Sequence, residues 1–310
     1  MAVVGGGPAG LAAAVAVGRM NRRAIVFEAG TPRTAHAPCY HNVLGLPEGI
    51  SGERLLALGH QQAERWGAAF RESAVADGHV TNGRSRFRLT LADETTVSAA
   101  GIVLATGVKD RQPTCGPLYG ETDRGIHYCV ICDGREATGE PTAVVGRSPH
   151  AVGMIEALRD FTSDLHLLLD AEDVALDGDS IACLGSWGVR VIPGLLEAAD
   201  FSDGVVHFRT SRGQTLEFAH VFLALGVVPR TRVAENLGCR LDAEGYVWTD
   251  EAGATSVPFV FAAGDCLGGL KQVTQAMAEG ERAAIGLSKA LREADGPAWP
   301  GVAGVVVEEP

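Results

Sequence analysis

The sequence predicts an α/β protein made of two strand–turn–helix units, with the second unit inserted into the first. Two observations indicate this fold. An apolar run at residues 1–5 leads through glycines into an alanine-rich helix, and the same order recurs where residues 142–145 enter a turn at Gly146. Apolar strands that alternate with helices are typical of parallel sheets covered by helices. We therefore predict two Rossmann-like, dinucleotide-binding domains.

The first turn has the spacing of a dinucleotide-binding fingerprint, GxGxxG, in Gly5-Gly6-Gly7-Pro8-Ala9-Gly10. The first glycine permits a tight turn, the second lets the backbone approach a pyrophosphate, and the third lets helix and strand pack closely. A second strand at 24–27 ends at Glu28, 18 residues beyond the last glycine, where a carboxylate can accept hydrogen bonds from a ribose. A glycine-rich turn without a ligand is the alternative.

The order of the remaining elements places an insertion in the middle of the chain. Strands at 142–145 and 165–169 flank a helix at 149–158, and a strand at 221–225 leads back to the first domain. Proline and glycine cluster at 112–116 and 225–229, which indicates hinges. The predicted domains are residues 1–112 with 227–310 for FAD, and residues 113–226 for an NAD(P)-binding-like domain.

The cysteines indicate redox chemistry. Seven cysteines in a chain without an export signal argue against a structural disulfide framework. Cys129 and Cys132 form a CxxC pair, and the five others include no second CxxC, so a zinc site lacks ligands. A CxxC pair can instead close a reversible disulfide. Two buried thiols are the alternative.

Three short motifs in order along the chain resemble the FAD signature of two-dinucleotide-domain flavoproteins. They comprise the strand end at 105–107, the strand end at 263–265 and the helix start at 271–272, in Ala105-Thr106-Gly107, Ala263-Gly264-Asp265 and Lys271-Gln272. The resemblance implies that Asp265 binds the ribitol and pyrophosphate region of FAD. It also implies that the backbone of Gln272 faces the pyrimidine edge of the flavin, at the start of a helix near residues 274–291.

The CxxC pair makes the resemblance more specific. Cys129-x-x-Cys132-Asp133-Gly134, together with the segment from Asn42 to Gly52, is similar to the low-molecular-weight thioredoxin reductases over nearly the whole chain. The resemblance implies that Cys132 lies nearer the flavin, that Cys129 attacks the partner disulfide, and that Asp133 is the acid/base. It also places Asn42 among the flavin-binding residues. A carboxyl beside the cysteines can move the protons that accompany two electrons, although Asp133 could instead cap a turn. His127, which precedes the pair, could tune it, although a structural histidine is the simpler interpretation.

The middle domain departs from this family where NADPH should bind. Its turn has Ser148 in place of the middle glycine, so a Cβ and a hydroxyl stand at the closest approach to a pyrophosphate. The next strand ends in Asp170, and no Lys or Arg lies between Arg159 and Arg190. Residues 113–226 hold 7 Lys and Arg against 17 Asp and Glu. A 2′-phosphate would be repelled there, so we do not expect NADPH.

Three interpretations of the electron path remain open, and each implies a different partner. The first is an NADH-dependent disulfide reductase with Asp170 on the ribose hydroxyls. The second is a reductase supplied by another donor such as ferredoxin. The third is an oxygen-dependent dithiol oxidase acting on a small molecule, although enzymes of that kind commonly carry histidine where this chain has Asp133. The substrate is then a thioredoxin-like protein or a small-molecule dithiol or disulfide. A degenerate flavoprotein that only binds a partner is a lesser alternative.

Composition excludes other classes of function. A net charge of −12 argues against a nucleic-acid-binding surface, and the longest apolar stretches fall short of the roughly 20 residues that cross a bilayer. We expect a cytoplasmic protein, and the resemblance implies a homodimer. Trp299, in the segment after the last helix, is a candidate cover for the flavin, although a frayed terminus is the simpler interpretation.

Overall fold

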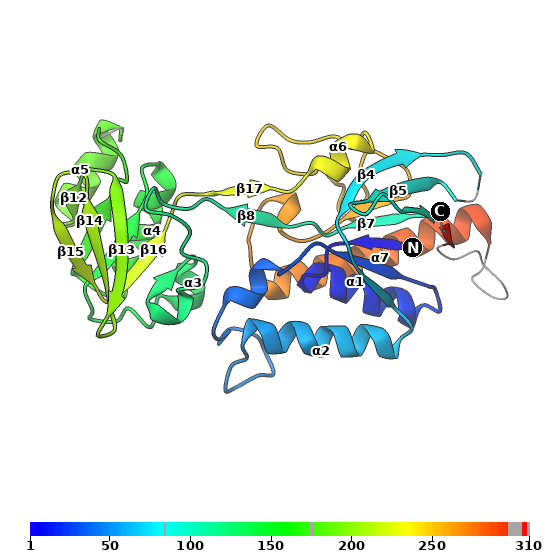
Figure 1. Ribbon diagram of the computed structural model, residues 1–310, viewed down its shortest axis with the longest axis horizontal. Helices are drawn as coiled ribbons and strands as arrows, with labels where there is room; N and C mark the ends of the chain where they lie inside the picture. Colours follow the sequence, from blue (N-terminus) through cyan, green and yellow to red (C-terminus); the bar gives the residue numbers. More distant parts are fainter. Residues whose placement is uncertain (84, 174–175, 297–305, 309–310) are drawn as a thin grey trace. The chain divides into compact units, whose positions relative to one another are not determined.

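The computed structural model describes residues 1–83, 85–173, 176–296 and 306–308 of the chain, which folds into two compact units (Figure 1). The first unit comprises residues 1–35 and 50–109 and the part of 229–310 that is described, and the second comprises residues 36–49 and 110–228. The chain therefore passes between units near residues 109 and 228, a few residues from the predicted boundaries. The segment 36–49 groups with the second unit, although its sequence position had suggested the first.

A five-stranded parallel sheet forms the centre of the first unit. Its order is β18-β7-β1-β2-β3, with β18 at Val260–Ala262, β7 at Ile102–Leu104, β1 at Ala2–Val4, β2 at Ile25–Glu28 and β3 at Ala69–Glu72. Every pairing in this sheet is parallel, and Val3 lies opposite Val26 on one side and Val103 on the other. Strands β18, β7 and β1 are apolar throughout and buried because both faces of the sheet are covered there, whereas the edge strand β3 carries Arg71 and Glu72.

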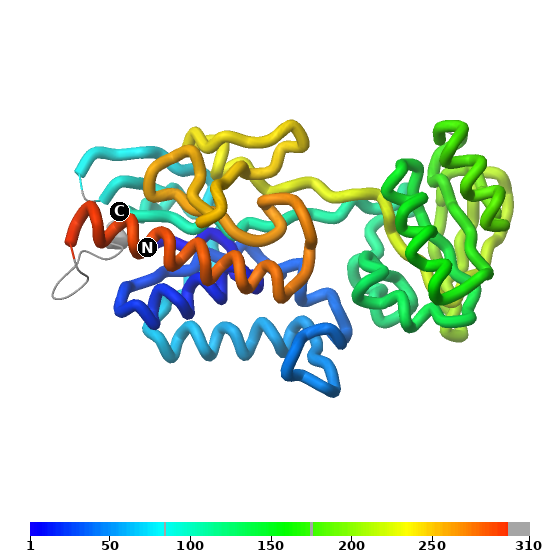
Figure 2. The backbone as a smooth tube through the Cα atoms, turned by 180° about the vertical axis from the view of Figure 1, so that it is seen from behind, coloured from blue at the N-terminus to red at the C-terminus, as the bar shows by residue number. Residues whose placement is uncertain are grey.

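Alternate residues of β1 serve two different cores. Val3 packs in a cluster with helices α1 and α7, whereas Ala2 and Val4 pack with the antiparallel strands on the opposite face. The helices are α1 at Pro8–Arg19, α2 at Gly52–Arg65, α6 at Arg232–Asn236 and α7 at Val273–Asp295, and the antiparallel strands are β4 at Val75–Val80, β5 at Phe87–Leu91, β6 at Thr96–Ala99 and β19 at Val306–Glu308. Both views show α7 running along α1, with α2 on the outer side of α1 (Figures 1 and 2).

Helices α1 and α7 approach each other at a glycine. A Cβ at Gly280 would overlap the carbonyl oxygen of Ala9, so only glycine allows the two backbones to meet there. Gly264 has a φ of +79°, and a Cβ on it would come within 2.8 Å of the Ala9 methyl. These contacts hold α1, α7 and the end of β18 together.

The second unit repeats the arrangement with a parallel sheet of order β12-β11-β10-β16-β9. Its strands are β12 at Arg190–Ile192, β11 at Leu165–Leu168, β10 at Thr142–Val145, β16 at His220–Leu223 and β9 at Ile126–His127. One face packs on α4 at Pro149–Leu158 and α5 at Gly178–Ser186, and the other on β13 at Leu196–Ser202, β14 at Val205–Thr210 and β15 at Thr215–Phe218. The prediction of two Rossmann-like α/β domains is confirmed.

Two short strands lie where the chain passes between the units. They are β8 at Val108–Asp110 and β17 at Val227–Pro229, and they pair with each other. Short 3₁₀ turns occur at Arg33–His36, Thr122–Arg124 and Asp265–Leu267, and a four-residue helix, α3, at Val130–Asp133. None of the helices in the described ranges has the length and apolar character needed to cross a membrane.

Candidate active site

The glycine-rich turn between β1 and α1 has the geometry that its spacing predicts. Gly5 has a φ of +115°, and a Cβ there would overlap the Ala105 carbonyl oxygen. A Cβ at Gly10 would overlap the Gly5 carbonyl oxygen, whereas a Cβ at Gly7 would meet no atom within 4 Å. Gly7 is the N-cap of α1, and Pro8 begins the helix. The turn therefore leaves open space at the N-terminus of α1, where the first N–H groups of the helix can bind a pyrophosphate.

Glu28 lies at the end of β2, as the motif requires, and has a histidine neighbour that the sequence did not indicate. Its Oε1 lies 2.9 Å from Nε2 of His60 on α2, and the His60 ring stacks on Phe70. Burial raises the pKa of Glu28, and His60 acts in the opposite direction. The sequence could not pair Glu28 with His60, because the two residues are 32 positions apart.

The ends of β7 and β18 are neighbours in the sheet and bring the two other motifs together. Ala105 is buried and donates its N–H to the Val4 carbonyl, and the Thr106 hydroxyl donates to the Arg230 carbonyl at 2.5 Å. Asp265 begins the 3₁₀ turn after β18, and its Oδ2 lies 3.7 Å from the Arg33 guanidinium. Arg33 is therefore a further candidate for an anion site, and no motif singled it out.

Side-chain contacts lie on both sides of the start of α7, in the loop before it and within the helix. Gln272 is the N-cap of α7, and Lys271 donates to the Gly269 carbonyl at 3.2 Å and lies 5.0 Å from the Tyr246 ring centroid. Glu279, one more residue without a sequence signal, accepts the N–H of Gly264 at 2.8 Å. Helix α7 thereby holds the loop that carries Asp265.

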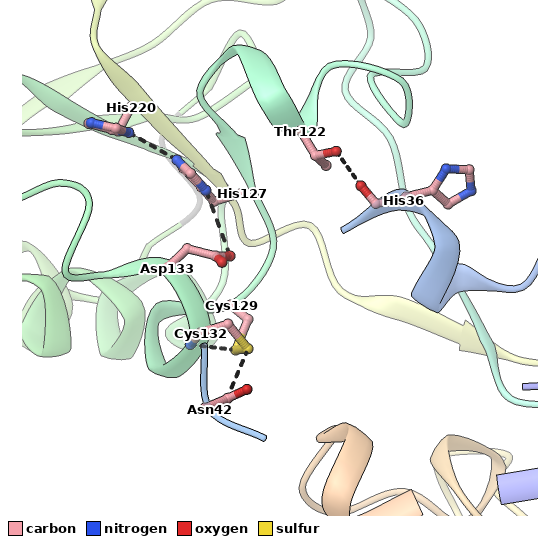
Figure 3. A network of polar contacts seen from close by, with 8 residues as sticks. All are labelled: His36, Asn42, Thr122, His127, Cys129, Cys132, Asp133 and His220. Atoms are coloured by element: carbon pink, nitrogen blue, oxygen red, sulfur yellow. Dashed lines mark hydrogen bonds and ion pairs between the residues drawn. A yellow bond between two sulfur atoms is a disulfide. The ribbon is translucent and has the colours of Figure 1, made fainter. Parts of the chain in front are cut away.

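Cys129 and Cys132 form a disulfide at the start of α3, with their Cα atoms 5.3 Å apart (Figure 3). Cys129 is the N-cap of this helix, and its Sγ accepts the backbone N–H of Cys132 at 3.2 Å. The Asn42 amide reaches the same pair, with Nδ2 3.9 Å from the Cys132 sulfur. The structure therefore places Asn42 beside the disulfide within the second unit, and its assignment to the flavin stays a prediction.

Asp133 follows the pair directly and faces a histidine. Its Oδ2 lies 3.7 Å from Nδ1 of His127, and Nε2 of His127 lies 2.9 Å from Nδ1 of His220 (Figure 3). The sequence interpretation of His127 as a structural residue missed this chain of contacts. Nothing in the sequence paired His220 with His127, because the two residues are 93 positions apart.

The turn of the second unit differs from the first at the same place. Ser148 is the N-cap of α4 with Pro149 as the first helical residue, just as Gly7 and Pro8 begin α1. A side chain therefore stands where the first unit leaves open space. The guanidinium of Arg147, in the same turn, donates to the backbone carbonyl of Asp170 at 2.8 Å.

The assignment of Asp170 to the ribose of NADH is wrong. Its side chain is 2% exposed and accepts hydrogen bonds from the Thr114 N–H at 2.9 Å, the Leu196 N–H at 2.9 Å and the Thr114 hydroxyl. A carboxylate used in this way is not available to a ligand. Asp170 instead holds the segment after β8 against β13. Trp299 lies outside the described residues.

The comparisons with known proteins agree with the fold and with the cysteine pair described above. The sequence profile of the pyridine nucleotide-disulphide oxidoreductases matches residues 1–280. The chain belongs to that family. Thioredoxin reductase of Bacillus subtilis strain 168 is 28% identical over 308 residues, covering 94% of each chain. The NADPH-dependent thioredoxin reductase 3 of Arabidopsis thaliana is 29% identical over 283 residues, which cover 85% of this chain but only 52% of that protein.

Solved structures of similar proteins have the same fold. The crystal structure of HlmI superposes with a TM-score of 0.86 at 28% identity, covering 95% of this chain and 92% of that one. Thioredoxin reductase from Streptococcus pyogenes MGAS5005 gives a TM-score of 0.85 at 25% identity, covering 94% and 97%. The protein is thus a thioredoxin reductase-like, flavin-dependent disulfide oxidoreductase, and its family uses FAD with a pyridine nucleotide.

Proposed function

We propose that this enzyme passes electrons between FAD and an external disulfide or dithiol through Cys129 and Cys132. The observation that carries the proposal is the disulfide at the start of α3, next to the carboxyl of Asp133 and in contact with the Asn42 amide. In this proposal Cys132 exchanges electrons with the flavin, Cys129 attacks the partner, and Asp133 holds and returns the proton. The partner is a thioredoxin-like protein or a small-molecule dithiol or disulfide.

The residues of the first unit fit FAD. The open space in front of Gly7 supports binding of the pyrophosphate at the start of α1, and Glu28 lies at the end of β2 for the ribose. Asp265 with Arg33 nearby would hold the ribitol and pyrophosphate region. Bound FAD supplies a carrier of two electrons. The strand ends of β7 and β18 and the start of α7 would complete the site, at Ala105, Thr106, Gly107, Gly264, Lys271 and Gln272.

The second unit fits a pyridine nucleotide poorly. Ser148 occupies the position where the backbone would come closest to a pyrophosphate, and the Asp170 carboxylate accepts hydrogen bonds from Thr114 and Leu196. No Lys or Arg lies between Arg159 and Arg190. We therefore propose that NADPH is not the electron donor. The NADH-dependent alternative needed Asp170 as a ligand of the ribose hydroxyls, and Asp170 is not available for that role. A poor fit to a pyridine nucleotide is compatible with two other candidate functions, an oxygen-dependent dithiol oxidase and a ferredoxin-dependent reductase. Asp133, at the position where such oxidases commonly carry histidine, favours the reductase direction.

An anaerobic titration of the oxidised flavoprotein tests the proposal. NADPH, NADH and dithiothreitol are added separately, and flavin bleaching is followed by absorbance. We expect bleaching by the dithiol and slow or no bleaching by NADPH, while rapid bleaching by NADPH would overturn our assignment of the donor. The variant Cys132→Ser should abolish dithiol-driven bleaching, and Cys183→Ser, at an exposed cysteine in α5, is the matched control. Turnover that survives Cys132→Ser would refute the role of the pair.

Two further parts of the proposal concern assembly and location, and the first depends on resemblance to the family. We propose a homodimer, which light scattering at micromolar concentration tests directly. We also propose a cytoplasmic location, where thiols and a reversible disulfide can exchange.

A further inference from the structure

The contacts beside the disulfide form a continuous series of titratable side chains. Asp133 follows Cys132, His127 lies 3.7 Å from Asp133, and His220 lies 2.9 Å from His127 (Figure 3). His127 uses one ring nitrogen toward each neighbour, Nδ1 toward Asp133 and Nε2 toward His220. A neutral imidazole has one donor and one acceptor nitrogen, so such a ring can receive a proton on one side and release one on the other.

The parallel pairing of β9 and β16 builds this series. His127 ends β9 and lies opposite Phe222 in the register, and its ring stacks on the Phe222 ring at 4.7 Å between centroids. His220 is two residues earlier on β16, on the same face of the strand because side chains alternate. The side chain of His127 is only 10% exposed. The ring is therefore held in one orientation between the carboxyl and the second histidine.

The far end of the series leads to an acidic surface. Glu136 and Glu140, both exposed, act electrostatically on His220 from the chain that follows α3. Burial lowers the pKa of His220, the neighbouring His127 lowers it further, and the two glutamates act in the opposite direction. The pKa of His220 therefore lies below the usual histidine value, and the ring nitrogen that carries no proton is available as an acceptor.

We propose that His127 and His220 carry protons between Asp133 and the surface beside Glu136 and Glu140. This inference rests on the proposed function, because it needs Cys129 and Cys132 to cycle between disulfide and dithiol. In the relay, His127 and His220 are positioning and proton-transfer residues that act through Asp133. They do not contact the external substrate.

The balance of the thiol chemistry requires a supply of protons at Asp133, which the relay would provide. Reducing the disulfide breaks one S–S bond, consumes two electrons from the reductant and two protons, and forms two S–H groups. Thiol–disulfide exchange expels one cysteine as a thiolate, and a proton from Asp133 neutralises it. Asp133 must then recover a proton before the next cycle. Shifts from His127 Nδ1 to the carboxylate, from His220 Nδ1 to His127 Nε2, and from surface water to His220 Nε2 restore it, after the 3.7 Å pair closes to hydrogen-bond distance.

A test independent of flavin uses dithiothreitol to reduce the oxidised protein. Reduction is quenched by alkylation, and labelling at Cys129 and Cys132 is resolved by mass spectrometry between pH 5.5 and 8.5. We expect His127→Gln to slow reduction about tenfold near pH 6.5 and His220→Gln roughly threefold, because a positioned acid contributes factors of this size or more. The differences should vanish at high pH, where the thiolate needs no proton.

His166 provides the matched control. It lies on β11 of the same sheet, its Nδ1 is 3.6 Å from Asp164, and burial lowers its pKa as at His220, yet it lies outside the series from Asp133 to His220. We expect His166→Gln to leave the rate and pH profile unchanged. Equal slowing in His166→Gln, or wild-type profiles in both relay variants, would overturn the proposal.

A second measurement needs no change of either relay histidine. Asp133→Asn removes the carboxylate, and the ring nitrogens of His127 and His220 are followed by NMR. We expect both rings to shift while His166 does not, whereas a shift confined to His127 would remove His220 from the relay. Failure of the proposed function would appear differently, as loss of any dependence of turnover on Cys132 with the histidine couplings intact.

Discussion

Asp170 offers the sharpest test of the structure, because its position contradicts the ligand role that the sequence suggested. The carboxylate accepts hydrogen bonds from two backbone N–H groups and one hydroxyl, and it is 2% exposed. Each hydrogen bond to a charged group contributes about 1.5–3 kcal/mol, and a buried unpaired donor costs about 1–3 kcal/mol. The backbone φ of +49° adds about 1 kcal/mol against alanine.

Asp170→Ala leaves two backbone N–H donors unpaired, at about 1.5 kcal/mol each, and adds the backbone cost, so we expect it to destabilise the second unit by about 4 kcal/mol. Asp170→Asn tolerates the same backbone and keeps one acceptor oxygen, so its cost should be about 1–2 kcal/mol. Asp173→Ala, at an exposed aspartate of the same acidic stretch, should stay within about 0.5 kcal/mol.

Amide hydrogen exchange followed by mass spectrometry measures these effects within the intact chain. A loss of about 4 kcal/mol corresponds to exchange roughly 1,000-fold faster at the Thr114 and Leu196 amides, if they open with the second unit. Unchanged protection in Asp170→Ala, accompanied by weaker NADH binding, would refute the structural role and restore the ligand interpretation.

Two other predictions follow from the glycine turn and the buried histidines. Gly7→Ala should leave the thermal unfolding midpoint of the flavin-free protein unchanged and weaken FAD binding at least about tenfold. Gly10→Ala should instead lower the midpoint, because its methyl group meets the Gly5 carbonyl oxygen. Equal midpoints of the two variants in calorimetry would contradict this. Burial lowers the pKa of His166 and His220, so the unfolded chain binds more protons just below pH 6.5. The free energy of unfolding, measured by urea titration, should fall as the pH drops through that window. The fall should be smaller in His166→Gln and His220→Gln.

Local patterns in the sequence predicted the elements that depend on neighbouring residues. The helix expected at 149–158 is α4, and the strand expected at 142–145 is β10, because the proline, the glycine and the apolar run that define them are adjacent. The apolar run at 257–263 predicts a strand before Asp265, and the observed strand is shorter, at Val260–Ala262, because Phe259 before it has a φ of +65°.

Pairings between distant residues could not be predicted in this way. Asp170 ends a strand, as a ribose ligand would, but its partners Thr114 and Leu196 lie 56 and 26 residues away. The contact between His127 and His220 likewise depends on the register of two strands that only the folded sheet brings together. A histidine at the start of an otherwise apolar strand was the available signal, and it identifies no partner by itself.

The meeting of α1 and α7 at Gly280 has a mechanical consequence. The three atoms nearest to a Cβ at Gly280 all belong to the Ala9 backbone, so at this point of contact no flexible side chain lies between the two helices to absorb a displacement. A shift at the start of one helix is therefore transmitted to the other. If FAD spans the starts of both, its adenine half and its isoalloxazine half rest on one stiff frame. Enlarging Gly280 should then loosen both halves of the cofactor together.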